Sequence, residues 1–173
     1  MVVVEYFAPI GGGIEINTDR TVVVRSVQCR RITHNGKGLL FLEDVTTDDL
    51  RLRKDQQAWA RQLNVENEGT HVTNDGGKLW VLGYKTERGG TLLLTKGGGQ
   101  SEVFGTFSYT TTAGKLAPMF VTEDASVFAF FSEVCYTGDP FAVLIRETRN
   151  GVTKEVGRGD GTVTPYVGVP AAK

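Results

Sequence analysis

The chain has 173 residues, of which 40% are hydrophobic and 23% are charged, a composition typical of one soluble globular domain. Its 19 basic and 20 acidic residues give a net charge of −1, so the sequence offers no strongly basic face to nucleic acid or to an anionic membrane. We therefore expect neither partner. No apolar run reaches the roughly 20 residues that a membrane helix needs.

The first residues, MVVVEYFAPIGGG, are apolar but lack the features of a secretory signal. They have no basic leader, and Glu5 interrupts the apolar run. The sequence indicates no particular location, and the cytoplasm is the default expectation for the chain as given.

Short apolar segments follow one another along the chain, separated by glycine or polar turns. Several alternate with polar residues or are rich in β-branched and aromatic residues, which favours strands. Residues 48–63 have helical propensity, but their apolar residues do not form a helical stripe. We therefore expect an all-β chain with strands at 14–16, 21–27, 38–45, 58–65, 78–84, 90–94, 102–109, 118–121, 125–131 and 141–147.

A repeat determines which β architecture is expected. Trp59 and Glu66 recur twenty-one positions later as Trp80 and Glu87, and weaker copies with insertions continue to residue 130. A period near twenty residues is solenoid spacing, because one such unit cannot bury its apolar side alone. The sequence predicts a right-handed, single-stranded parallel β-helix with a period of about 21 residues, and a β-sandwich is the alternative.

We expect a single domain over residues 1–173. Residues 1–20 would form an N-terminal strand, cap or oligomer contact. Residues 21–148 would form the stacked coils, and residues 149–173 a C-terminal tail.

Three segments carry a family resemblance: LNVENEGTHVTNDGGKLWVLGYKTERGGTLLLTKGGG, FGTFSYTTTAGKLAPMFVTEDASV and SEVCYTGDPFAVLIRETRNG. With them, residues 56–148 resemble the C-terminal coils of large bacterial proteins in the pectate-lyase-like, right-handed β-helix superfamily. The resemblance implies a fold more than an activity, because the superfamily includes lyases, hydrolases and non-catalytic adhesive or scaffold pieces. Its catalytic residues usually lie on middle coils, so none is transferred to this chain.

The cysteines and histidines are interpreted as structural residues. Cys29 and Cys135 would lie too many coils apart for a disulfide, and we expect two free, buried thiols. His71 shares its repeat position with Leu92 and Met119, which indicates a half-buried core residue. No metal-ligand spacing, calcium-binding aspartate cluster or cofactor motif is recognisable, so no cofactor or metal is expected.

Glu66 and Glu87 are the weak catalytic candidates. The repeat places one above the other at about 5 Å, a spacing that a retaining glycosidase uses. We expect these carboxylates instead to turn outward and to pair with Lys85 or Arg88. The alternatives are a polar binding face that includes Lys85, Arg88 and Tyr109, and catalysis by the two glutamates.

The same repeat predicts two further sets of side chains that stack in columns on successive coils. Trp59, Trp80 and Tyr84 could stack on sugar rings if exposed, but the shared position of the tryptophans indicates a stacked ladder in the core. A column of alternating charge is expected on successive coils, formed by Lys54, Asp75, Lys96 and Glu123.

The favoured function is a non-enzymatic structural or adhesive module. We expect a homo-oligomer, either a dimer or a trimer, because the end of a β-helix exposes backbone and core that must be covered. The alternative is a carbohydrate-active enzyme, a lyase or hydrolase, or a carbohydrate-binding module, with a polysaccharide as partner. The expected oligomer contact is formed by Val2, Val3, Val4, Tyr6 and Phe7.

Overall fold

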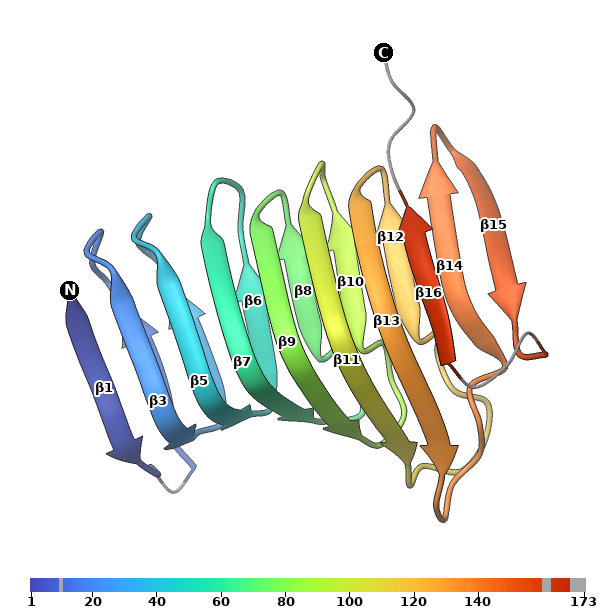
Figure 1. Cartoon of the computed structure of the whole chain (residues 1–173), viewed down its shortest axis with the longest axis horizontal. Coiled ribbons are helices and arrows are strands. Elements are labelled where there is room, and N and C mark those ends of the chain that lie inside the picture. Colours follow the sequence, from blue (N-terminus) through green and yellow to red (C-terminus); the bar gives the residue numbers. More distant parts are fainter. Residues whose placement is uncertain (10, 160–162, 169–173) are drawn as a thin grey trace.

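The computed structural model describes residues 1–9, 11–159 and 163–168. All the regular elements in this part of the chain are β-strands. Parallel coils stack into a solenoid of about 7 turns, which confirms the expected all-β solenoid over the sandwich (Figure 1). In the described residues, no helix is long and apolar enough to cross a membrane.

Each coil contributes one strand to each of two 8-stranded sheets. The first sheet contains β1 (Val2–Phe7), β3 (Val22–Gln28), β5 (Leu40–Thr47), β7 (Gln57–Glu66), β9 (Lys78–Glu87), β11 (Gln100–Thr110), β13 (Ser126–Cys135) and β16 (Val163–Gly168). The second sheet contains β2 (Gly13–Ile16), β4 (Arg31–His34), β6 (Asp49–Leu52), β8 (Val72–Asp75), β10 (Leu93–Lys96), β12 (Phe120–Glu123), β14 (Val143–Arg149) and β15 (Val152–Gly157).

The last two strands break the parallel pattern. β15 pairs antiparallel with β14, and β16 pairs antiparallel with β13. Both strands belong to the expected C-terminal tail, of which residues 160–162 and 169–173 lie outside the described residues.

The coils differ in length although their strands stay in register. Trp59 pairs with Trp80 and Ala58 with Leu79, which confirms the expected register of the central coils. The expected period is too long for the first coils, because Leu40 already pairs with Ala58. Near the C-terminus the coils are longer, as the expected insertions predict: Leu93 pairs with Phe120, and Ser101 pairs with Val127. One fixed period therefore describes only the middle of the stack.

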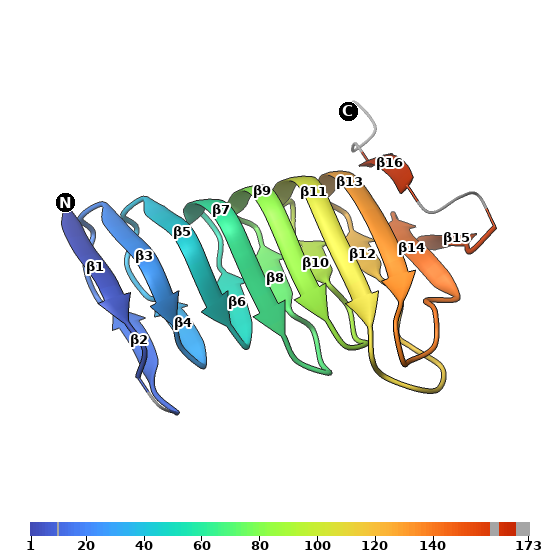
Figure 2. The same ribbon diagram turned by 60° about the horizontal axis from the view of Figure 1, so that its bottom comes forward.

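Much of the difference in coil length lies in the connections from the first sheet to the second. They are short at residues 29–30 and at residue 48, and longer at 67–71 and 111–119. Figure 2 shows the longer loops on one side of the stack after β7, β9 and β11. The variation therefore lies outside the core.

A column of left-handed residues interrupts the strands of the first sheet. Each of the first six coils has a residue with φ between 49° and 76° at one equivalent position, where the register skips a residue. This conformation lets the strand turn without losing its pairing on either side. The column is formed by Tyr6, Ser26, Asp44, Gln62, Gly83 and Gly105.

The core follows from period-two alternation in both sheets. Inward residues such as Val24, Leu42 and Leu50 are at most 2% exposed. Cys29 is buried as expected, but Cys135 is exposed, so the prediction of two buried cysteines is wrong for the second one. Both thiols are free, as predicted.

The expected core ladder of tryptophans is wrong. Trp59 and Trp80 do pair in register, but they are half-buried on the outer face of the first sheet, and only Tyr84 lies in the core. The neighbouring inward positions are taken by small residues such as Ala58 and Ala60, which lie in the core. Outside, the rings form contacts along the stack: Phe41 with Trp59 at 5.1 Å, Trp80 with Phe104 at 6.1 Å, and Phe104 with Phe128 at 4.9 Å.

The predicted charge column is correct for three of its four members. Lys96 pairs in register with Asp75 and Glu123, and it forms an ion pair with Asp75 at 3.2 Å. Lys54 does not belong to this column, because Leu52 pairs with Asn74 and places the residue after Leu52 beside Asp75. A second alternating column, which was not predicted from the sequence, lies on the first sheet and is formed by Glu5, Arg25, Glu43 and Arg61.

Candidate functional site

The two candidate glutamates occupy neighbouring positions on β7 and β9. Glu66 pairs in register with Glu87, and Glu87 with Tyr109 of β11. Lys85 lies between the carboxylates, with its Nζ 2.6 Å from Oε1 of Glu66 and also hydrogen-bonded to Glu87. Asn64 donates a second hydrogen bond to Glu66, with a length of 2.8 Å. The repulsion expected between stacked carboxylates is therefore relieved by a shared cation.

The pairing shifts the acid–base properties of this carboxylate cluster. Partial burial raises the pKa of Glu87, but hydrogen bonds from Lys85 and Tyr109 outweigh it and bring the pKa below its ordinary value. Burial likewise lowers the pKa of Lys85, and its hydrogen bonds to Glu66 and Glu87 raise it by more. Both groups are thus held in their charged forms.

The charged states of this pair differ from those that a retaining glycosidase uses. A retaining mechanism needs one carboxyl group with a raised pKa to protonate the leaving oxygen. Glu87 has a lowered pKa, and Glu66 already accepts hydrogen bonds from Lys85 and Asn64. The Lys85 ammonium also lies 5.2 Å from the ring centre of Tyr109, so this ring contributes to the cation's environment. Arg88 is exposed and forms no ion pair with the described residues.

His71 is fully buried rather than half-buried, and it is satisfied by structural hydrogen bonds. Its Nε2 lies 2.7 Å from the carbonyl oxygen of Asn67, and its Nδ1 lies 2.7 Å from the hydroxyl oxygen of Thr86. Burial lowers the pKa of His71, although the backbone contacts oppose this shift. The ring is accordingly a neutral core residue that fixes the loop after β7.

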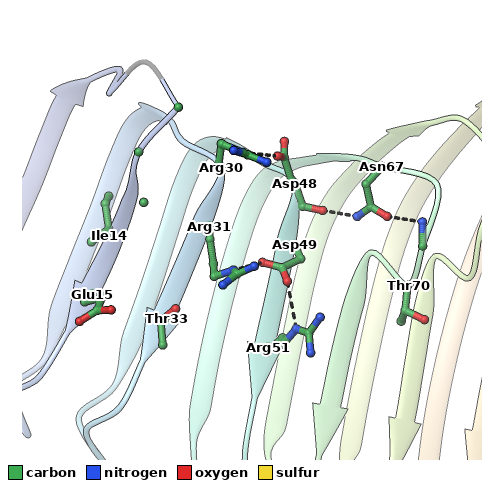
Figure 3. A pocket seen from close by; sticks show the side chains of 14 residues that line it. Ile14, Glu15, Arg30, Arg31, Thr33, Asp48, Asp49, Arg51, Asn67 and Thr70 are labelled. Carbon is green, nitrogen blue, oxygen red and sulfur yellow. Dashed lines mark hydrogen bonds and ion pairs between the residues drawn. The ribbon is translucent and has the colours of Figure 1, made fainter.

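An open polar hollow of about 750 Å³ lies beside the first four coils (Figure 3). Its walls come from the loop before β2, the starts of β4 and β6, and the loop after β7. The hollow exists because the connections at residues 29–30 and 48 are short, whereas those of the first and fourth coils are longer. The hollow was not predicted from the sequence, because it depends on the shorter period of the first coils.

Paired charges line this hollow. Arg30 lies 3.5 Å from Asp48, and Arg31 lies 3.4 Å from Asp49 on the next coil. Asp49 also accepts a 3.0 Å hydrogen bond from Arg51, so two arginines flank one carboxylate (Figure 3). The signal was present in the sequence, where the pair Arg30-Arg31 is followed one short coil later by the pair Asp48-Asp49.

The hollow has no excess of either charge. Arg30, Arg31 and Arg51 are balanced by Glu15, Asp48 and Asp49 among its lining residues. The remaining lining is formed by four glycines and by Ile14, Thr33, Asn67 and Thr70. Such a surface can offer hydrogen bonds to a neutral polar molecule but lacks the net charge that would attract an ion.

No group of histidine, cysteine, aspartate and glutamate side chains suited to a metal occurs in the described part of the chain. Comparison of the chain with protein-family models, with curated proteins and with solved structures found no match.

Proposed function

We propose that the chain is a non-enzymatic β-solenoid module with a structural or adhesive role, and that it assembles with further copies of itself. The observation that carries the proposal is the position of Lys85 between Glu66 and Glu87. It neutralises the carboxylate pair that would otherwise be the best catalytic candidate. A relationship to the terminal coils of bacterial pectate-lyase-like proteins belongs to the same proposal and is supported by the stacked parallel coils.

The outer aromatic residues also support a structural role. Phe41 and Trp59 stack at 5.1 Å with an interplanar angle of 17°, so each ring covers a face of the other. Stacking on a sugar requires an exposed ring face. This stacking stabilises the outside of the sheet and covers one face of each of the two rings.

A carbohydrate-binding module is the second candidate, and the polar hollow favours it. Its balanced arginine and carboxylate groups, with Asn67 and the threonines, resemble the donors and acceptors that a polyhydroxylated neutral ligand would need. Arg31 and Arg51 are the residues of choice for a test, because their side chains are 66% and 69% exposed.

The proposal is tested with activity and binding assays on the purified chain. Absorbance assays for unsaturated uronides on pectate, alginate and related polymers should stay flat, and a glycan array should give no specific signal. Product formation that is lost in both Glu66→Gln and Glu87→Gln would establish the enzyme instead. Glycan binding that is lost in Arg51→Ala but kept in Arg88→Ala would establish the binding module.

A further inference from the structure

The N-terminal end of the solenoid has two unpaired strand edges. β1 and β2 each have a neighbouring strand on one side only, and they end the two sheets (Figure 2). The backbone nitrogen of Val2 donates to the carbonyl of Thr21 on the β3 side. Because backbone groups alternate along a strand, those of Val3 and Glu5 point away from β3, where the described residues supply no partner.

β2 repeats this arrangement. The carbonyl groups of Gly12 and Ile16 accept hydrogen bonds from Arg30 and Asn35 of the second coil. The alternate groups of Gly13 and Glu15 therefore face the open side. Both sheets leave their edges free at the same end of the molecule.

The core is also uncovered at this end. Val2 and Val4 point inward and pair in register with Val22 and Val24, which are 2% and 0% exposed. Val2 and Val4 themselves are only half-buried, because none of the described coils covers them on the side away from β3. Beside them Met1, Val3, Tyr6 and Phe7 are 72%, 46%, 78% and 49% exposed. An apolar end with free strand edges is a surface that another β-strand can cover.

The opposite end cannot supply that cover by simple repetition. A head-to-tail stack would require β1 of the next copy to lie parallel on β13, and β2 to lie parallel on β14. Those places are taken by the antiparallel strands β16 and β15. β15 is in addition exposed along its whole length, and its Glu155 forms an ion pair with Arg146 of β14, as is typical of a protected edge.

We infer that two copies of the chain join through their N-terminal ends, with β1 of one copy pairing antiparallel to β1 of the other. When two identical ends face each other across a two-fold axis, their strands run in opposite directions, so the pairing must be antiparallel. Such an isologous contact pairs the free N-terminal edges of both copies with each other. No further copy can then add, and the assembly is a closed dimer. This inference deepens the proposed self-assembly and fixes both the number of copies and the surface.

A competing surface lies on the outside of the first sheet. Exposed apolar side chains gather there on β9, β11, β13 and the residue after it: Leu82, Phe107, Phe130, Val134 and Tyr136. This outer apolar patch belongs to strands that are paired on both sides, so covering it would leave the N-terminal edges open. It therefore provides the matched control.

The test is the mass of the full chain in solution, measured by sedimentation equilibrium over a range of micromolar concentrations. We expect twice the monomer mass of 18.8 kDa. Val3→Pro removes a backbone donor that the monomer does not use, and Val3→Lys adds a charge to the edge. Each should weaken the dimer about tenfold or more, because the symmetric contact loses the interaction in both copies. Phe107→Lys, on the outer apolar patch, should leave the dimer unchanged.

Amide hydrogen exchange gives a second readout that does not depend on a variant. The amides of Val3 and Glu5 should be protected at high protein concentration and exchange freely on dilution, whereas the amide of Val4, which points toward β3, should be protected at both concentrations. A monomer at high micromolar concentration, a trimer or open polymer, or a dimer disrupted only by Phe107→Lys would overturn the inference. These results are independent of the enzymatic and glycan assays, so the dimer and the proposed function can fail separately.

Discussion

Gly90 provides the sharpest test of how the coils stack. It lies in the connection between β9 and β10 with a φ of +117°, and a Cβ built on it would lie 2.2 Å from the carbonyl oxygen of Gly69 on the preceding coil. Gly90→Ala should therefore incur two costs. The backbone conformation costs about 1–3 kcal/mol for a residue with a side chain. The forced separation of two coils adds about 1–3 kcal/mol.

Gly98 is the matched control. Its φ is +78°, and a Cβ there would meet nothing within 4 Å. Gly98→Ala should therefore lower the free energy of unfolding only by the cost of the backbone conformation, about 1–2 kcal/mol. The assay is chemical denaturation with urea, comparing midpoints at unchanged slope. Equal destabilisation by the two substitutions would refute the contact between Gly69 and Gly90, and with it the reasoning that one coil rests directly on the next.

Two further predictions concern titratable groups. Because burial lowers the pKa of His71, the unfolded chain takes up a proton near its ordinary pKa of about 6.5 that the folded chain does not, and stability should fall as the pH drops below that value. His71→Leu should reduce this acid sensitivity in denaturation midpoints measured at neutral and mildly acidic pH; an unchanged pH dependence would contradict the assignment. Lys85→Met removes the cation between two stacked carboxylates, so the pKa of Glu87 should rise in an NMR titration of the glutamate carboxyl carbons, whereas Lys54→Met should leave it unchanged.

The stacking of the central coils could be predicted because identical side chains recur there at the same spacing. Trp59 over Trp80 and Glu66 over Glu87 fix the register without any knowledge of the fold. In the first coils only apolar residues recur in register, such as Val2, Val3 and Val4 over Val22, Val23 and Val24. Their strands TVVVRSV and GLLFLEDV share only an apolar pattern, and a pattern of that kind fits more than one offset. The shorter period of these coils and the polar hollow that depends on it were missed for this reason.

The direction in which a side chain points was the second feature that could not be predicted from the sequence. In the segment Ala58-Trp59-Ala60 the alternation shows that the tryptophan opposes the alanines, but all three residues are apolar. Whether the small residues or the large ring lie inside depends on the whole cross-section, which has to accommodate Leu63 and Tyr84 as well. The local sequence does not contain that information. The pairing of Glu66 with Lys85, in contrast, could be anticipated because it depends only on neighbouring strands.

The different coil lengths have a consequence for the growth of such a chain over evolutionary time. The short coils near the N-terminus and the long coils near the C-terminus contribute strands to the same two sheets, and the surplus residues lie in the connections. Duplication or loss of a complete coil would therefore preserve the cross-section and change the length of the stack by about 4.8 Å, the spacing of neighbouring strands. In a protein built in this way, the number of coils determines the distance between the two ends of the solenoid.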